Sequence, residues 1–355
     1  MRSDYAIGLL IFIISTFCSC QAQDETRSTI KSTDRSDTSS IPVTQYTDSM
    51  FFIEGQLCQH LREIYQDTKG NLWFGTNVYD LMMYNGDSLI YIIEEDGFSG
   101  GRVTGFAEDS SGHLWIASSS GLNRYDEGMF TLLNEDDGLE NNEIWSILID
   151  ADDTIWIGHN AGLSRFDGEI FETIEISNPD ISDPNTVYSA DRITAIAQDQ
   201  DGNLWLGTDG YGIIRYDGNQ FKHYTMADGL VDNTINDLKV DIDGNLWIGT
   251  FFGGVSKYDG TKFHNYTSDG LVNGVEVGGF YEDVNGDIWF AVENNGIYKY
   301  DGDKFLHYPK AQFSEGSILS IFRDREDRLW LGGWGGLFRM MDDRFTPVTS
   351  DGPWD

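Results

Sequence analysis

Short extended stretches alternate with polar turn segments along most of the chain. In the clearest copy, between residues 193 and 225, we expect four strands: Ile193–Gln198, Leu204–Thr208, Gly212–Tyr216 and Gln220–Thr225. The turns between them carry Asp, Asn and Gly, which tolerate the left-handed backbone that tight hairpins need. No long segment of this region places apolar residues at helical spacing, so the pattern predicts an all-β chain.

The same pattern recurs seven times, each copy centred on one tryptophan. These residues are Trp73, Trp115, Trp156, Trp205, Trp247, Trp289 and Trp330. They lie 41 or 42 residues apart, except for one interval of 49 that contains an insertion around residues 178–190. Four strands per repeat match one propeller blade, and seven blades close a ring without exposed edges. We predict an all-β, seven-bladed β-propeller of four-stranded antiparallel blades, with the tryptophans packed between blades.

The closure of this ring stays open at the level of sequence. Residues 50–53 resemble the fourth strand of a blade, yet residues 344–348 already fill that place in the seventh repeat. One of the two segments is expected to be a fifth or displaced strand.

The amino terminus has the features of a secretory signal. Arg2 precedes an apolar stretch at residues 6–14, which is shorter than the roughly 20 residues that span a bilayer. The Phe-Cys-Ser-Cys segment that ends at Cys20 resembles a bacterial lipobox, so Cys20 is the predicted lipidation site. The alternative is cleavage after Ala22, which gives a secreted or soluble periplasmic protein.

The segment after this signal is rich in Ser, Thr and Asp, a composition that cannot offset the entropy of ordering. We therefore predict a signal at residues 1–20, a flexible tether at 21–45 and the propeller at 46–355. This organisation predicts an outer-membrane lipoprotein, exposed to the periplasm or at the surface, that meets the membrane only through its lipid.

Composition narrows the range of partners. The chain has 59 acidic against 23 basic residues, a formal net charge of −36. Such a charge repels nucleic acid and anionic lipid surfaces, so neither is an expected partner. Three cysteines exclude a disulfide scaffold, and Cys58 is expected to be buried and inert.

Three sub-motifs recur in order along the repeats. Residues 244–250 read Gly-Asn-Leu-Trp-Ile-Gly-Thr, residues 254–260 carry Lys-Tyr-Asp-Gly, and residues 269–271 read Asp-Gly-Leu. This composite resembles the two-component regulator propeller repeats, whose members are mostly extracytoplasmic sensor halves of hybrid histidine kinases that often recognise glycans. No kinase or receiver motif follows the repeats in this sequence. The resemblance therefore implies ligand binding or scaffolding by this chain, with any signalling carried by a separate partner.

Equivalent positions just before each first strand form a variable set. Counting back from the Asp that ends each first strand gives His60, Arg102, Glu143, Arg192, Thr234, Glu276 and Ser317. Two residues later come Arg62, Thr104, Trp145, Thr194, Asn236, Gly278 and Leu319. Variation in charge and size at one structural level is what contact with an asymmetric ligand requires, although drift on a solvated rim gives the same pattern.

The loops between second and third strands add aromatic residues to the same face of the ring. They are Tyr79, His159, Tyr211, Phe251, Phe252 and Trp334. Aromatic rings beside Arg and Glu suit a glycan, a peptide or a partner protein. The candidate contacts are His60, Arg102, Glu143, Trp145, His159, Arg192, Tyr211, Phe251, Glu276 and Trp334.

The remaining motifs predict neither metal nor catalysis. The Asp-x-Asp-Gly-Asn turns at 199–203 and 241–245 lack the glycine at position six and the glutamate at position twelve of a calcium loop, so they are read as hairpin turns. No cofactor or enzyme motif is present. The main hypothesis is a non-catalytic binding propeller. The alternatives are a propeller lyase or hydrolase that uses His159 with Glu143 or Glu276, and a structural member of a cell-envelope complex.

Overall fold

The computed structural model describes residues 28–29, 55–77, 81–181, 184–312, 317–342 and 344–354. The predicted signal at residues 1–20, with its lipidation site Cys20, lies outside the described residues, as does most of the predicted tether. Of the tether, residues 28–29 form the short strand β1 (Ser28–Thr29), which pairs with the outer strand of the second blade and makes that sheet five-stranded.

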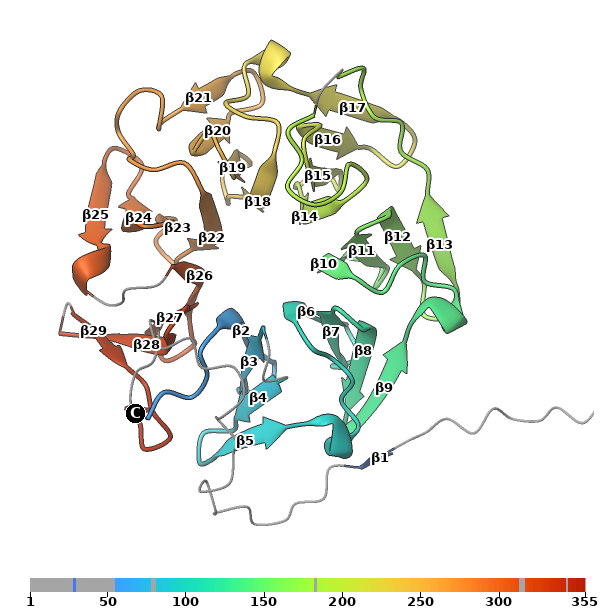
Figure 1. Ribbon diagram of the computed structural model, residues 1–355, viewed down its shortest axis with the longest axis vertical. Coiled ribbons are helices and arrows are strands. Elements are labelled where there is room, and N and C mark those ends of the chain that lie inside the picture. The colour runs from blue at the N-terminus through green and yellow to red at the C-terminus, as the bar shows by residue number, and fades with distance from the viewer. Residues whose placement is uncertain are drawn as a thin grey trace, which may run out of the picture.

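Seven antiparallel sheets stand around a central axis and form a seven-bladed β-propeller (Figure 1). The innermost strands are β2 (Leu61–Gln66), β6 (Val103–Glu108), β10 (Ile144–Ile149), β14 (Ile193–Gln198), β18 (Ile235–Val240), β22 (Val277–Glu282) and β26 (Ile318–Arg323). The second strands are β3 (Leu72–Thr76), β7 (Leu114–Ser118), β11 (Ile155–His159), β15 (Leu204–Thr208), β19 (Leu246–Thr250), β23 (Ile288–Val292) and β27 (Leu329–Gly333). The seven-bladed prediction is thereby confirmed.

Two further strands complete each blade toward the rim. The third strands are β4 (Leu81–Tyr84), β8 (Gly121–Asp126), β12 (Gly162–Phe166), β16 (Ile213–Tyr216), β20 (Val255–Tyr258), β24 (Gly296–Tyr300) and β28 (Gly336–Met341). The outer strands are β5 (Leu89–Ile92), β9 (Met129–Leu133), β13 (Phe171–Ile174), β17 (Phe221–Tyr224), β21 (Phe263–Asn265), β25 (Phe305–Pro309) and β29 (Arg344–Pro347). Short 3-10 turns follow four of the outer strands: η2 (Glu94–Asp96), η3 (Glu135–Asp137), η4 (Met226–Asp228) and η5 (Lys310–Gln312). The described residues contain no α-helix.

One hydrogen-bonded pair recurs in every blade. The aspartate that follows the innermost strand accepts the indole N–H of the repeated tryptophan at 2.7–3.1 Å, for example Asp241 from Trp247 at 2.9 Å. Its other oxygen accepts the backbone N–H four residues on, as Asp241 does from Asn245. The carboxylate therefore closes the hairpin and holds the buried indole.

The tryptophans pack between neighbouring blades, as predicted. Five of them meet an aromatic ring on the third strand of the following blade, with centroids 4.9–6.2 Å apart. One such pair is Trp247 and Tyr300, 5.3 Å apart. The tyrosine of the recurrent Arg/Lys-Tyr-Asp-Gly motif thus serves the interface between blades.

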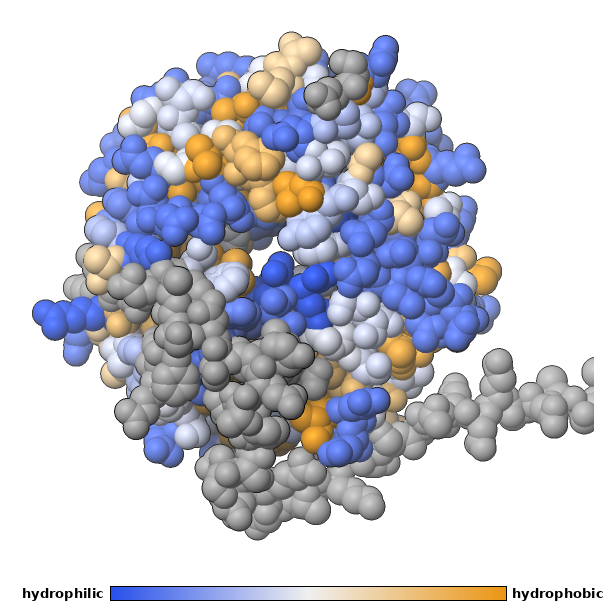
Figure 2. Space-filling view, in the orientation of Figure 1, coloured by the Kyte–Doolittle hydropathy of each residue, from blue (hydrophilic) through white to orange (hydrophobic). Residues whose placement is uncertain are grey.

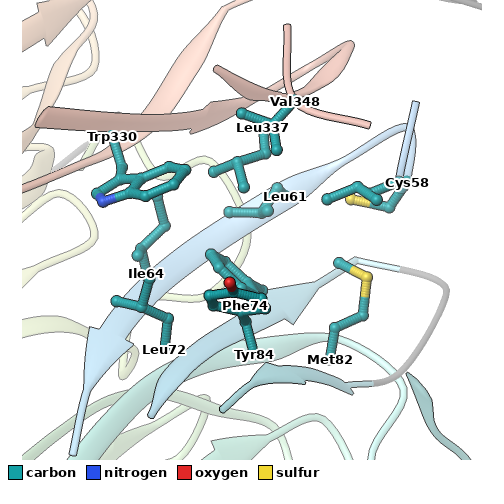
Figure 3. Packing of buried hydrophobic residues seen from close by; sticks show 11 residues of the cluster. Cys58, Leu61, Ile64, Leu72, Phe74, Met82, Tyr84, Trp330, Leu337 and Val348 are labelled. Atoms are coloured by element: carbon teal, nitrogen blue, oxygen red, sulfur yellow. The ribbon is translucent and has the colours of Figure 1, made fainter. Parts of the chain in front are cut away.

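The ring closes where blade seven meets blade one, and among the described residues these two blades share no named strand. The strand predicted at residues 344–348 occupies the outer place of blade seven as β29, while residues 50–53 lie outside the described residues. Trp354 stacks on Tyr84 of blade one at 4.4 Å and lies 6.1 Å from Trp330 of blade seven. Buried side chains of both blades, Cys58 among them, form one cluster at this seam (Figure 3).

Asp241→Ala should lower the free energy of unfolding by about 1–3 kcal/mol, because it leaves the buried Trp247 indole N–H and a turn amide without an acceptor. Chemical denaturation followed by tryptophan fluorescence measures the change. The exposed Asp243, two residues along the same turn, supplies the control Asp243→Ala. Equal stability of the two variants would contradict a structural role for the Asp–Trp pair.

Candidate functional site

The residues predicted to be equivalent before each innermost strand are equivalent in space. In each blade, the carbonyl of this residue accepts the N–H of the residue that directly follows the second strand, at 2.9–3.2 Å. Asn160 donates in this way to Glu143, and Trp334 to Ser317. This bond joins the two loop positions at one mouth of the ring.

The second predicted set lies at backbone bulges. In six blades the ladder between the first two strands shifts register at this residue, for example at Trp145 between Ile144 and Ser146. In blade six the irregularity is longer: Gly278 still pairs with Ala291, and Gly279 and Phe280 lie outside the ladder. In the other six blades the bulge leaves one residue outside the ladder and turns its side chain, so that residue faces the axis.

A cavity of about 600 Å³ occupies the centre of the ring. Figure 2 shows the ring hollowed at its centre, with hydrophilic residues beside the hollow. Its lining includes all seven bulge-position residues, namely Arg62, Thr104, Trp145, Thr194, Asn236, Gly278 and Leu319. Of the ten candidate contacts, the cavity brings together Arg102, Trp145, Arg192, Phe251, Glu276 and Trp334.

Three arginines surround Trp145 at this mouth. The guanidinium carbons of Arg102 and Arg192 lie 4.0 and 4.4 Å from the Trp145 ring centre, and that of Arg62 lies 6.0 Å away. The Trp145 indole N–H donates to Asn160 at 2.8 Å, which fixes the plane of the ring. Trp145 therefore presents an oriented aromatic face to a cationic wall.

The insertion in the fourth repeat completes this wall. Asp209 accepts the backbone N–H groups of residues 187–189 at 2.7–3.1 Å and pairs with Arg192 at 3.3 Å. The tethered loop places Tyr188 4.3 Å from the Arg192 guanidinium and 5.5 Å from the Trp145 ring. Arg192 is thereby held between two aromatic rings, with its side chain only 1% exposed.

The opposite part of the lining is acidic. Glu276 and Glu293 of blade six both line the cavity, and desolvation together with a hydrogen bond to Glu293 raises the pKa of Glu276 to about 8. Ser317 donates to Glu293 at 3.3 Å. At neutral pH the pair therefore holds a proton and presents both a donor and an acceptor.

A second acidic pair lies further along the innermost strands. Desolvation, reinforced by the negative charge of Asp237, raises the pKa of Glu63 to about 8. Desolvation also raises the pKa of Asp237, which accepts the backbone N–H of Phe280 at 3.0 Å. Both residues line the cavity, so at neutral pH Glu63 is largely neutral beside Arg62.

Four candidate contacts lie outside the lining. Glu143 pairs with Arg102 at 2.8 Å and so positions that arginine without lining the cavity itself. The centre of the His60 ring lies 4.1 Å from that of Trp334. Tyr211 is half-buried in the loop between β15 and β16. His159 is fully buried.

His159 takes the place of a turn-closing hydroxyl. It ends β11, where four of the other blades have a Ser or Thr such as Thr250, whose hydroxyl donates to the turn carbonyl of Gly254. His159 instead lies 2.8 Å from the Ser164 hydroxyl and accepts the N–H of Ala161. Desolvation lowers its pKa to about 4, and the structure does not bring it to the cavity with Glu276.

Several lining residues were missed by reasoning from the sequence. Asn77 and Glu293 occupy the same position as Phe251 and Trp334, directly after the second strand, and alignment on that position would have found them. Tyr188 comes from the insertion, which has no counterpart in the other repeats. Tyr79 lies outside the described residues.

Within the described residues, no group of three His, Cys, Asp or Glu side chains is placed to hold a metal ion. None of the described helices is long and apolar enough to cross a membrane.

Six segments of the chain match the family model described as two component regulator propeller. They are residues 57–78, 97–120, 138–161, 188–210, 229–252 and 312–335. Each covers the first two strands of a blade and the loop between them. The corresponding segment of blade six, where the bulge is irregular, lies outside these matches. No curated protein matches the sequence.

Solved propellers share the fold at low identity. The chain is 23% identical to the extracellular domain of a protein assigned to the hybrid two component systems of B. thetaiotaomicron, with a TM-score of 0.66. The match covers 83% of this chain but only 40% of the extracellular domain. A second match, at 17% identity and a TM-score of 0.60, is a catalytically inactive virginiamycin B lyase from Staphylococcus aureus with quinupristin; it covers 78% of this chain and 93% of that one.

A third similar structure is PorZ of Porphyromonas gingivalis, a bacterial surface component of the type-IX secretion system. The identity is 15% and the TM-score 0.59, over 85% of this chain and 39% of PorZ. This chain therefore spans about two fifths of the first and third of these structures. At these identities the likeness concerns the fold.

Glu63→Gln should stabilise the protein at pH 8 and leave it nearly unchanged at pH 5. The unfolded chain ionises Glu63 near its ordinary pKa of 4.5, whereas the folded protein does so near 8. Between these values the folded state binds more protons, so the wild-type stability falls as pH rises, and the variant escapes this fall. Relative to pH 5, we expect a gain of about 3–4 kcal/mol at pH 8 in urea denaturation. The exposed Glu169→Gln is the control, and equal pH profiles for both variants would contradict the assignment.

Proposed function

We propose that the protein is a non-catalytic, extracytoplasmic binding propeller that holds its ligand at the mouth of the central channel. The observation that carries the proposal is the Arg192 guanidinium, which is buried in the cavity wall and whose Nε and Nη1 have no hydrogen-bond partner among the described residues. Buried polar groups are rarely left unsatisfied, because each costs about 1–3 kcal/mol. A buried guanidinium with two unused donors beside an oriented tryptophan favours a polar ligand at this mouth.

The mixture of groups in the lining restricts the ligand to a polar molecule with flat or apolar faces. Trp145 and Phe251 offer ring faces, while the arginine wall and the Glu276 pair offer charge and hydrogen bonds. A glycan, a peptide or a loop of a partner protein has this character. The similarity to an extracellular domain and to a bacterial surface component supports a place outside the cytoplasm.

The two alternatives differ in their support. A propeller lyase or hydrolase was expected to use His159, which lies inside blade three rather than in the cavity. The fold that is shared with virginiamycin B lyase keeps this class open to test by product mass after incubation with polysaccharide and peptide panels. A structural role in an envelope complex is supported only by the similarity to PorZ, and a salt-sensitive pull-down from membranes would favour it.

Phe251→Ala should weaken binding to glycan or peptide arrays about tenfold or more, because its ring lines the cavity. The neighbouring Phe252 lies outside the lining and is 47% exposed, so Phe252→Ala is a matched control that should bind as the wild type does. The arrays are probed with the purified, labelled protein. Equal loss in both variants, or none in either, would remove the channel mouth as the binding site.

Lipidation of Cys20 remains part of the proposal, since it would hold the propeller at a membrane through a tether. Cys20→Ser should move the protein from the membrane fraction to the soluble fraction of fractionated cells. Cys58→Ser is the control, because Cys58 is buried at the blade seam. A Cys20→Ser protein that stays in the membrane pellet would refute the anchor.

A further inference from the structure

The cationic wall carries one positive charge more than its own carboxylates balance. Arg102 pairs with Glu143 at 2.8 Å, and Arg192 pairs with Asp209 at 3.3 Å. In the part of the chain that the structure describes, Arg62 has no carboxylate within ion-pair distance, and its guanidinium carbon lies 6.0 Å from the Trp145 ring centre. The wall is therefore matched to one negative charge that no ion pair among the described residues supplies.

The unused hydrogen-bond donors of this wall belong to the same groups. Arg192 Nε and Nη1 and Arg102 Nε are buried and lack acceptors among the described residues. Desolvation, reinforced by the positive charges of Arg102 and Arg192, lowers the pKa of Arg62 to about 10. An anion bound here would accept hydrogen bonds from the unused donors and would offset the repulsion between the guanidinium groups.

The surrounding acidic groups select a monoanion. Asp237 and the Glu276 pair line the same cavity, and a dianion such as a phosphate monoester would be repelled by them more strongly. A carboxylate carries one charge and has the planar shape that guanidinium groups bind in parallel. The ligand group that best fits the wall is thus a single carboxylate.

Beside the arginines, the lining changes from charge to small hydroxyls and apolar surface. Ser146 Oγ and Thr194 Oγ1 are buried, and neither has a hydrogen-bond partner in the described parts of the chain. Two residues beyond the bulge positions of three successive blades, Phe106, Ile147 and Ile196 also line the cavity. Unused hydroxyls next to an aliphatic patch suit a peptide bond followed by an apolar side chain, whereas a sugar ring would leave its own hydroxyls unpaired against that patch.

We propose that the channel binds the carboxyl-terminal residue of a peptide, with the terminal carboxylate on Arg62, Arg102 and Arg192. The Ser146 and Thr194 hydroxyls bond the last peptide unit, and the last side chain rests on Phe106, Ile147 and Ile196. This inference rests on the proposed function and names the ligand class for the same cavity.

The test uses two peptide arrays immobilised through their amino termini, which cover every combination of the last two residues. One array has free carboxylates and the other has carboxamides, and a third array carries uronate oligosaccharides. The purified protein should bind peptides that end in an apolar residue, and amidation should weaken binding about 10- to 100-fold. Equal binding of amidated peptides, or binding to uronates alone, would overturn the inference and leave the proposed function intact. A protein that binds no array would contradict both.

Arg62→Gln separates a binding role from a structural one. It should weaken binding of the free-carboxylate peptides about 10- to 100-fold and leave the melting temperature equal or higher, because it removes a buried charge without a counterion. The exposed Arg165, on the rim side of blade three, gives the control Arg165→Gln, which should bind normally. A lower melting temperature with unchanged affinity for Arg62→Gln would assign Arg62 to the fold and refute the carboxylate site.

Discussion

The fold depends on a hydrogen bond between an aspartate and a tryptophan, repeated once per blade. The carboxylate spans the first hairpin, holding a turn amide with one oxygen and a buried indole with the other. The indole so placed meets a ring of the following blade. A single short motif therefore closes the hairpin, positions the tryptophan side chain and provides the aromatic contact to the next blade. Its sevenfold repetition makes these local geometries add up to a closed circle.

The chemistry of the channel follows from that framework by a different route. The Asp–Trp pair lies at one end of the innermost hairpin, while the bulges and the loop after the second strand lie at the other. Side chains at the mouth consequently do not take part in the Asp–Trp packing that is the same in every repeat. This separation is why three arginines and several carboxyl groups share one cavity in a chain that is otherwise uniform from blade to blade.

Much of this arrangement could be predicted from the sequence, because the aspartate that follows the innermost strand occupies the same position in every blade. Counting from it placed Arg102, Trp145 and Arg192 correctly at one level. The direction of individual side chains was harder to predict. His159 looked like a loop residue, but it is the last residue of a strand and points into its blade. Tyr188 lies in an insertion that the other repeats lack. Its position is fixed by a backbone hydrogen bond to Asp209 that the sequence does not reveal.

The bulge at each innermost strand has an evolutionary consequence. In six blades the residue outside the ladder lines the channel, and some of these side chains also reach the next blade, as Thr104 does when its hydroxyl donates to the Ile144 carbonyl at 3.0 Å. Substitution at these positions therefore changes the channel lining without removing a hydrogen bond of the ladder. A lineage of such propellers can thus diverge in specificity by single substitutions, while pairs that join neighbouring blades, such as Arg102 and Glu143, change together.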